Sequence, residues 1–280
     1  MRFQLDLTKE YGIVLEGGGA RGSYQIGAWK ALREAGIKIR GIAGASVGAL
    51  NGALICMDDL EKAEEIWENI RYSQVINVDD DVIETVKKLD LKSLDLVKVA
   101  EDAKRILKDK GLDITPLKNL IESVVDEDKI RSSDRELYLT TYSVTDRELL
   151  VLNAKDIPDG EIGDMLLASA YFPAFRNDKL GGKRYLDGGG WNNVPINILL
   201  EHDYKDILVI RIYGLGYDSE RTTEIPEDVH VTHIAPRQDL GGILEFDRTR
   251  ARKNMTLGYY DAKRVLYGLE GRWYYLYAPE

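Results

Sequence analysis

The chain has 280 residues, of which 44% are apolar, and this is enough to build an extended hydrophobic core. Its formal net charge of −10 and pI near 5.0 argue against a nucleic-acid partner, because phosphates bind basic surfaces. The same charge limits contact with a membrane surface to a transient, local and apolar one. The single cysteine, Cys56, allows neither an internal disulfide nor a zinc site and is compatible with a reducing compartment.

The first twelve residues lack the uninterrupted apolar stretch of a signal peptide. No run elsewhere approaches the roughly 20 apolar residues of a membrane span. We therefore expect a cytoplasmic protein. Without internal repeats or a linker-like composition, residues 1–280 are expected to form a single domain, and the sequence leaves the oligomeric state open.

The first half of the predicted fold alternates strands and helices. A strand over 11–15 runs into three glycines, followed by a helical pattern that Gly36 ends. A second strand over 37–43 leads into a glycine-flanked serine and a small-residue helix carrying Leu50, Leu54 and Met57. The repeated order of strand, glycine turn and helix predicts an α/β fold with a mainly parallel sheet.

The segment from about 58 to 125 is polar and helical, and no strand is expected in it. Pro116 after Thr115 marks a helix start at its first turn. The mixed helices over about 80–125, within a helical insertion over about 70–130, have two interpretations: a lid whose apolar face meets a bilayer or micelle, or an ordinary packed layer. The acidic run 79–81 is interpreted as a solvated loop before a helix rather than a calcium site.

The second half contains the remaining predicted elements. Strands over 137–144 and 149–152 are joined by a turn at Thr145 and Asp146, and a helix follows over 162–170. Further strands are expected over 207–213, 230–234 and 273–277, with a long helix over 249–266 between the last two.

Residues 17–22, GGGARG, match G-x-G-x-x-G between a strand and a helix. A dinucleotide site would need an acidic residue at the end of the second strand, and here that strand ends in Gly-Ala-Ser. A Walker loop would need Lys-Ser or Lys-Thr after the glycines. Two interpretations remain: a nest of backbone N–H groups for an anionic oxygen, or a tight turn without a ligand.

Gly44-Ala45-Ser46-Val47-Gly48 matches G-x-S-x-G where a strand meets a helix, a turn that exposes a serine hydroxyl. Side chains at Gly44 or Gly48 are expected to collide with the helix or the strand. The alternative is that Ser46 only caps the helix. A serine nucleophile needs a base; His233 near a strand end could complete a triad with Asp187, whereas His202 and His230 are expected at solvated positions.

Asp187, Gly188 and Gly189 follow the short apolar pair Tyr185-Leu186, which places a carboxylate in a glycine-rich bend after a short strand. An ordinary β-turn is the alternative, because Asp-Gly is a common turn pair.

Four stretches taken together resemble the patatin-like phospholipases over about residues 12–200: GGGARG at 17–22, GASVG at 44–48, ASAYFPAF at 168–175 and DGGGWNNVP at 187–195. The helix containing residues 258–262 resembles the closing helix of that family. Gly190 adds a third glycine to the usual pair, and residues 174–176 replace a common proline-rich ending.

The resemblance implies a three-layer α/β sandwich and a serine–aspartate dyad without histidine. Ser46 would attack an acyl ester of a lipid, Asp187 would accept its proton and later help to activate water, and the N–H groups of Gly18 and Gly19 would face the oxyanion. Arg21 would steady the loop or attract a lipid phosphate. The supporting glycines would be Gly17 and Gly22 in the loop, Gly44 and Gly48 at the serine, and Gly188 and Gly189 at the aspartate.

We therefore expect a lipid acyl hydrolase that needs no cofactor and no metal. Two other hypotheses stay open: a catalytically silent lipid- or ligand-binding protein on the same fold, and a nucleotide-dependent enzyme that uses the first glycine loop. The lipid head group, the acyl position and the chain length are not determined by these motifs.

Overall fold

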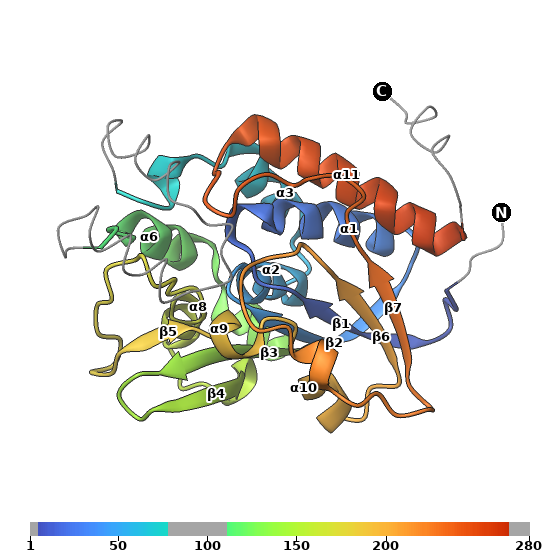
Figure 1. The fold of residues 1–280 in the computed structure, drawn as a ribbon, viewed down its shortest axis with the longest axis horizontal. Helices are drawn as coiled ribbons and strands as arrows, with labels where there is room; N and C mark the ends of the chain where they lie inside the picture. Colours follow the sequence, from blue (N-terminus) through green and yellow to red (C-terminus); the bar gives the residue numbers. More distant parts are fainter. Residues whose placement is uncertain (1–4, 78–110, 269–280) are drawn as a thin grey trace.

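The computed structural model describes residues 5–77 and 111–268 (Figure 1). Its strands are β1 (Glu10–Leu15), β2 (Lys38–Ala45), β3 (Glu136–Ser143), β4 (Glu148–Asn153), β5 (Tyr185–Asp187), β6 (Asp206–Ile210) and β7 (His230–Ile234). The α-helices are α1 (Ser23–Glu34), α2 (Val47–Cys56), α3 (Leu60–Asn69), α6 (Thr115–Val124), α7 (Glu127–Ser132), α8 (Ile162–Ser169), α9 (Gly189–Asn192), α10 (Ile196–Glu201) and α11 (Arg248–Tyr267). Short 3-10 helices are η1 (Gly19–Gly22), η2 (Tyr72–Gln74), η3 (Ala154–Asp156) and η4 (Ser219–Thr222).

The strands of the described residues form one seven-stranded sheet in the order β4-β3-β2-β1-β6-β7, with β5 also paired to β3. The pairs among β3, β2, β1, β6 and β7 are parallel, and β4 and β5 run antiparallel to β3. The expected α/β class with a mainly parallel sheet is confirmed.

Successive strand residues enter two separate cores, because side chains alternate between the faces of a sheet. Ile13, Ile42 and Leu208 pack under the large helical layer, whereas Val14 and Ala43 pack with α10 on the other face. Helices α1, α2, α3, α6, α8 and α11 thus cover one face and α10 the other (Figure 1). This gives the expected three layers.

The ends of β2 and β5 meet along the same flank of β3. Strand β2 is parallel to β3 and ends where Ala45 pairs with Thr140. Strand β5 is antiparallel to β3 and ends where Asp187 pairs with Thr141, the next residue. Because the two strands approach from opposite directions, the residue after Ala45 meets the last residue of β5. This pairing brings Ser46 and Asp187 together.

Most predicted elements lie within one or two residues of the observed ones. Helix α1 ends before Gly36, which has φ +80°, and its following amides bond back to the carbonyls of Leu32 and Arg33. Helix α6 starts at Thr115 with Pro116 in its first turn, as predicted. In the described parts of 58–125 there is no strand. The expected strand over 273–277, the acidic run 79–81 and most of the insertion lie outside the described residues.

Two short helices, α9 and α10, were not predicted, because six residues or fewer carry too little periodicity to reveal them. The predicted strand over 207–213 ends at Ile210, so that prediction was too long. The reason is that the amides of Ile212 and Tyr213 donate to the Glu16 carboxylate instead of a neighbouring strand. Within the ranges that the structure describes, no helix is both long and apolar enough to span a bilayer.

Candidate active site

Ser46 lies in a strained turn between β2 and α2. Its φ of 54° and ψ of −126° are unusual for a residue with a side chain and cost roughly 1–3 kcal/mol. Its amide donates to the Ser169 hydroxyl over 2.9 Å, and its own side chain makes no cap hydrogen bond to α2. The alternative of a helix-capping serine therefore does not hold, and the hydroxyl stays available.

The two flanking glycines are required by space, as predicted. A Cβ at Gly44 would lie 2.5 Å from the backbone of Gly48, and a Cβ at Gly48 would lie 2.1 Å from the carbonyl oxygen of Leu15 on β1. The turn can therefore pack against β1 only without side chains at these positions.

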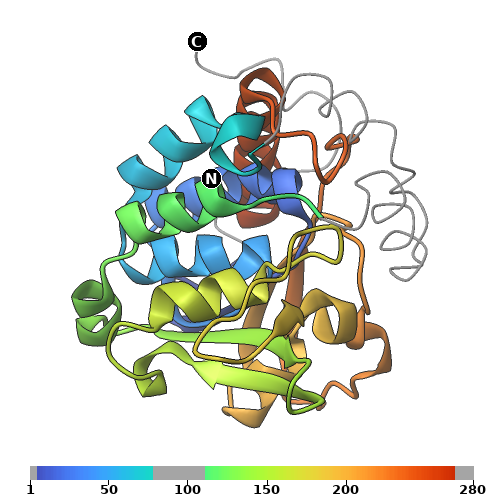
Figure 2. The same ribbon diagram turned by 90° about the vertical axis from the view of Figure 1, so that its left-hand side faces the viewer.

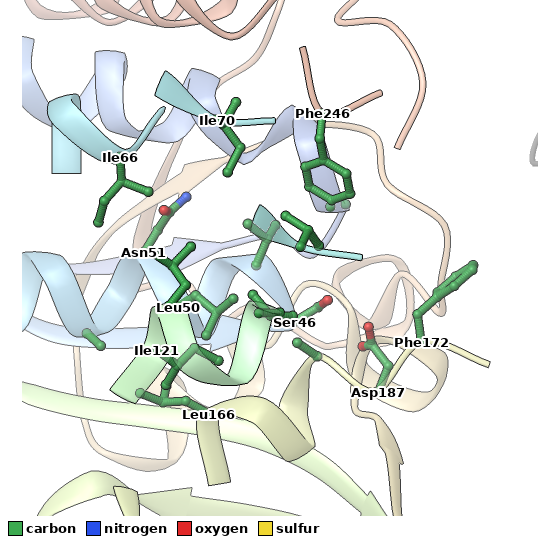
Figure 3. A pocket seen from close by; sticks show the side chains of 18 of the residues that line it. Ser46, Leu50, Asn51, Ile66, Ile70, Ile121, Leu166, Phe172, Asp187 and Phe246 are labelled. Atoms are coloured by element: carbon green, nitrogen blue, oxygen red, sulfur yellow. The ribbon is translucent and has the colours of Figure 1, made fainter. Parts of the chain in front are cut away.

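Asp187 points toward Ser46 from the end of β5 (Figure 3). The Gly189 amide donates to Oδ1 over 2.8 Å. Burial raises the pKa of Asp187 to about 6, and the nearby Ser46 hydroxyl and Gly189 amide oppose that rise. The carboxylate is thus a stronger base than an ordinary aspartate.

The glycine loop provides the amides expected of an anion nest. Within the described residues, the amides of Gly17 and Ala20 donate to the carbonyls of Asn193 and Ile243, whereas those of Gly18 and Gly19 have no protein acceptor. Gly18 and Gly19 also line the pocket that contains Ser46 and Asp187. The loop therefore carries two free donors beside the serine.

The other predicted glycines support this arrangement from outside the pocket. Gly17 packs against the Asn193 side chain and the Ala45 carbonyl, and Gly22 packs against Val47. Gly188 lies against the Thr140 carbonyl, where a Cβ would approach to 2.2 Å. Their role in this structure is close packing.

Arg21 fixes the glycine loop to neighbouring backbone. Its Nε donates to the Gly241 carbonyl over 2.8 Å, and its Nη1 donates to the carbonyls of Ile212 and Tyr213. Of the two roles that the sequence left open for Arg21, these contacts support steadying the loop rather than binding a lipid phosphate.

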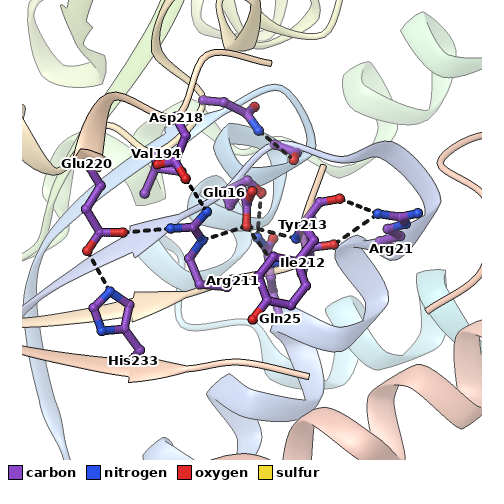
Figure 4. Close-up of polar contacts among 12 residues, drawn as sticks. Glu16, Arg21, Gln25, Val194, Arg211, Ile212, Tyr213, Asp218, Glu220 and His233 are labelled. Carbon is purple, nitrogen blue, oxygen red and sulfur yellow. Dashed lines mark hydrogen bonds and ion pairs between the residues drawn. The ribbon is translucent and has the colours of Figure 1, made fainter. Parts of the chain in front are cut away.

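Glu16, between β1 and the glycines, holds the same backbone segment from its other side (Figure 4). It is 2% exposed and accepts hydrogen bonds from the amides of Ile212 and Tyr213 over 2.7 and 3.0 Å. Arg211 pairs with Glu16 over 3.1 Å and with Asp218 and Glu220 over 2.7 Å each. We call Glu16, Arg211, Asp218 and Glu220 the loop-support cluster; sequence patterns gave no sign of it.

The histidines lie away from Asp187. His233 Nε2 contacts Glu220 Oε1 at 2.5 Å at the edge strand β7, and His202 stacks on Tyr138. His202 and His230 are exposed, as expected. The geometry therefore provides no triad of Ser46, Asp187 and His233.

A pocket with about 1100 Å³ of empty space, open mouth included, starts at Ser46 and Asp187. Its wall is almost entirely apolar, with side chains from α2, α3, α6 and α8 (Figure 3). The apolar residues of α6 are Leu117, Leu120, Ile121 and Val124. Leu117 and Ile121 are buried, so the described end of the insertion is a packed wall of the pocket rather than a detached lid.

Two further residues of the site carry no motif of their own. Ser169, buried at the end of α8, orients the Ser46 backbone. Asn193 bonds through its backbone and side chain to Gly17 and lines the pocket. Each lies within one of the four stretches that carried the family resemblance, which is the only sequence signal that could have indicated it.

Comparison with known proteins agrees with this geometry. The family model described as patatin-like phospholipase matches residues 13–200, about two thirds of the chain. The chain belongs to this family. The patatin-like segment contains all four stretches singled out above, and α11 lies beyond it.

Curated relatives match this patatin-like chain only locally. A lysophospholipase of Aspergillus terreus (strain NIH 2624 / FGSC A1156) is 58% identical over 50 residues, and a neuropathy target esterase of Drosophila sechellia is 57% identical over 47 residues. These matches cover 18% and 17% of the chain and 3% of each relative. The crystal structure of VipD from Legionella pneumophila, at 14% identity and a TM-score of 0.53, covers 91% of the chain and 66% of VipD and shares the fold.

Proposed function

We propose that this patatin-like protein hydrolyses acyl esters of lipids, with Ser46 as nucleophile and Asp187 as its base. The observation that carries the proposal is that the side chains of Ser46 and Asp187 lie together at the start of an apolar pocket, beside two free amides (Figure 3). Family membership supports the same activity, and a lysophospholipase and an esterase are among the proteins with local matches.

In the first half of the reaction, the Ser46 Oγ attacks the ester carbonyl carbon while its proton passes to Asp187. The negative charge that develops on the carbonyl oxygen faces the amides of Gly18 and Gly19. Each such donor is typically worth about 3 kcal/mol of barrier reduction. Collapse of the tetrahedral intermediate expels the alcohol, which takes the proton from Asp187, and leaves an acyl group on Ser46.

In the second half, Asp187 accepts a proton from water as the water attacks the acyl-enzyme. The same amides face the second oxyanion, and the fatty acid leaves as the proton returns to the Ser46 oxygen. The proposed scheme uses no histidine, because His233 contacts Glu220 and His202 stacks on Tyr138, and none of the three histidines lines the pocket. With a pKa of about 6, Asp187 is ionised near neutral pH.

A fluorophosphonate probe tests this proposal directly, because it forms a bond to an activated serine and loses fluoride. Wild type is expected to be labelled and to hydrolyse p-nitrophenyl esters, whereas Ser46→Ala is expected to be unlabelled and inactive. Asp187→Asn should lower both rates by at least about 10³-fold. Equal labelling of wild type and Ser46→Ala would show that the reactive nucleophile is another residue. No labelling of a folded wild type would favour a silent binding protein.

Gly18→Ala separates the oxyanion role from the rest of the site. Its Cβ would lie 2.8 Å from the Ile212 side chain and 3.1 Å from the Cα of Gly214, so the loop must shift. We expect kcat to fall roughly 10²-fold with little change in KM, because the amides would act mainly on the transition state. An unchanged kcat in the folded variant contradicts this assignment.

A further inference from the structure

The pocket continues from Ser46 along the whole length of helix α2. Its lining residues on this helix form one stripe at helical spacing, namely Ser46, Val47, Leu50, Asn51, Ala53, Leu54 and Met57. Helix α6 contributes a second stripe, spaced three and four residues apart, and α3 and its C-cap contribute Ile66, Trp67 and Ile70. Figure 2 shows these helices, α2 in blue, α3 in cyan and α6 in green, as neighbouring rods. We call this part of the pocket the α2 groove.

The polar residue in the α2 groove presents no free polar atom to it. Asn51 Nδ2 donates to the Gly22 carbonyl and to Gln25 Oε1, each over 2.9 Å. Asn51 Oδ1 accepts from Trp67 Nε1 over 3.0 Å. The described residues that line the groove away from Ser46 and Asp187 therefore suit a hydrocarbon, and their side chains offer no hydrogen bonds to a polar head group.

The two ends of the α2 groove differ in chemistry. At one end are Ser46, Asp187 and the free amides. At the other, Met57 Sδ accepts from the Asp126 amide over 3.4 Å, and Val125 is followed by the acidic start of α7. The described lining of the pocket on the α2 side ends at Met57, so an alkyl chain gains free energy from apolar contact with this helix as far as Met57.

We propose that the α2 groove holds one extended acyl chain and sets its preferred length at about twelve to fourteen carbons. From Ser46 to Met57 the helix advances about 16 Å at roughly 1.5 Å per residue. A zigzag of C–C bonds of about 1.5 Å advances roughly 1.3 Å per carbon. This inference rests on the proposed function, since the length of the acyl chain is counted from the ester carbonyl at Ser46.

The test uses ethyl n-alkylfluorophosphonates with octyl, dodecyl, tetradecyl and hexadecyl chains, at nanomolar concentrations where they stay monomeric. The Ser46 Oγ–P bond forms, the P–F bond breaks, and the serine proton passes to Asp187 as fluoride leaves. The second-order labelling rate of wild type should rise by up to roughly fourfold for each methylene up to dodecyl or tetradecyl, then level off.

Val124→Trp should shorten the groove and so the preferred chain length, because Val124 lines the groove in the last turn of α6. Its ratio of tetradecyl to octyl labelling rates is expected to fall roughly tenfold or more below that of wild type. Ser123→Trp is the matched control, since Ser123 is exposed on the same turn and does not line the groove; its ratio should match wild type.

Met57→Ala should act in the opposite direction by opening the far end, so hexadecyl should then label faster than tetradecyl. This variant keeps the proposal testable if Val124→Trp does not fold. A wild-type rate that is the same from octyl to hexadecyl, or a break in the profile that neither variant moves, overturns the length scale alone. Loss of all labelling in folded wild type overturns the proposed function instead.

Discussion

Glu16 and Asp187 are both carboxylates near the glycine loop, but Glu16 is buried whereas Asp187 is partly accessible from the pocket. Glu16 has the Arg211 guanidinium and two backbone amides as partners. Asp187 has a serine hydroxyl and one amide, and no cation among the described residues contributes to its pKa. Burial raises the pKa of Glu16, but Arg211 and the two amides offset part of that effect and tie the carboxylate to the backbone. Asp187 has no cation to offset the effect of burial on its pKa, as is common for functional carboxylates.

The loop-support cluster and the pocket also differ in whether a cation accompanies their carboxylates. Three carboxylates surround Arg211, and although burial opposes its charge, their combined effect raises the pKa of Arg211 above its usual value. Among the described residues, the pocket instead has a wall of alkyl and aromatic side chains around one carboxylate, that of Asp187. We therefore expect substitutions in the cluster to affect stability, and substitutions of Asp187 to trade activity against stability.

The largest expected effect on stability is that of Arg211→Met. Removal of the cation leaves Glu16 buried without a counter-charge, which costs about 3–5 kcal/mol of unfolding free energy. Urea unfolding of wild type and Arg211→Met at neutral pH measures this loss of unfolding free energy. The control is Arg221→Met, because Arg221 contacts the same Asp218 over 3.1 Å but is 82% exposed and should cost less than about 1 kcal/mol. Equal costs for the two variants would contradict a special role for the buried pair.

Asp187→Asn should stabilise the protein while it removes activity. Burial raises the pKa of Asp187 from an ordinary 3.8 to about 6. The folded state therefore favours the protonated carboxyl, and its ionisation penalty is absent below about pH 4, grows up to about pH 6 and is complete above it. At neutral pH this penalty amounts to about 3 kcal/mol. The unfolding free energy of Asp187→Asn should therefore be higher than that of wild type by up to that amount.

The check on this prediction is thermal or urea unfolding of both proteins at several pH values. The difference in unfolding free energy between Asp187→Asn and wild type should shrink as the pH falls from about 7 to about 4. A difference that stays constant with pH, or a less stable variant at neutral pH, would show that folding does not raise the pKa of Asp187.

The smallest expected effect is the pH dependence of wild-type hydrolysis. In the proposed mechanism Asp187 must be ionised to act as the base, so kcat/KM for a short-chain ester should be constant above about pH 6 and fall about tenfold per pH unit below it. A rate profile in buffers of constant ionic strength measures the inflection. His233→Gln should show the same inflection, since His233 contacts Glu220 outside the pocket. An inflection that moves or disappears in His233→Gln would show that the group whose ionisation controls the rate is not Asp187.

Local pattern predicted much of the fold because the relevant forces are local. Alternating and helical spacing located β1, β2, β7 and α11 within one or two residues. Glycine spacing around Ser46 predicted its turn, and Gly44 and Gly48 do pack too closely for a side chain. The glycine loop was correctly placed between a strand and a helix, but its free amides depend on which carbonyls lie nearby.

Other features had no local signal. The end of β6 at Ile210 follows from the Glu16 carboxylate, which is far away in sequence and takes the amides of Ile212 and Tyr213. The contact of Arg21 with Gly241 and that of Ser169 with Ser46 likewise join distant segments. Such hydrogen bonds need the completed sheet, so no pattern in either segment could have predicted them.

The sequence by itself determined that a serine and an aspartate would each end a strand in a glycine-rich turn, because turn geometry depends on neighbouring residues. Only the tertiary structure decided that β2 and β5 approach the same flank of β3 from opposite ends and so bring these side chains into one pocket. It also decided that α2, α3 and α6 enclose an apolar groove from that point. The physical reason is that strand pairing and helix packing depend on the whole chain, whereas caps, turns and alternation depend on a few adjacent residues.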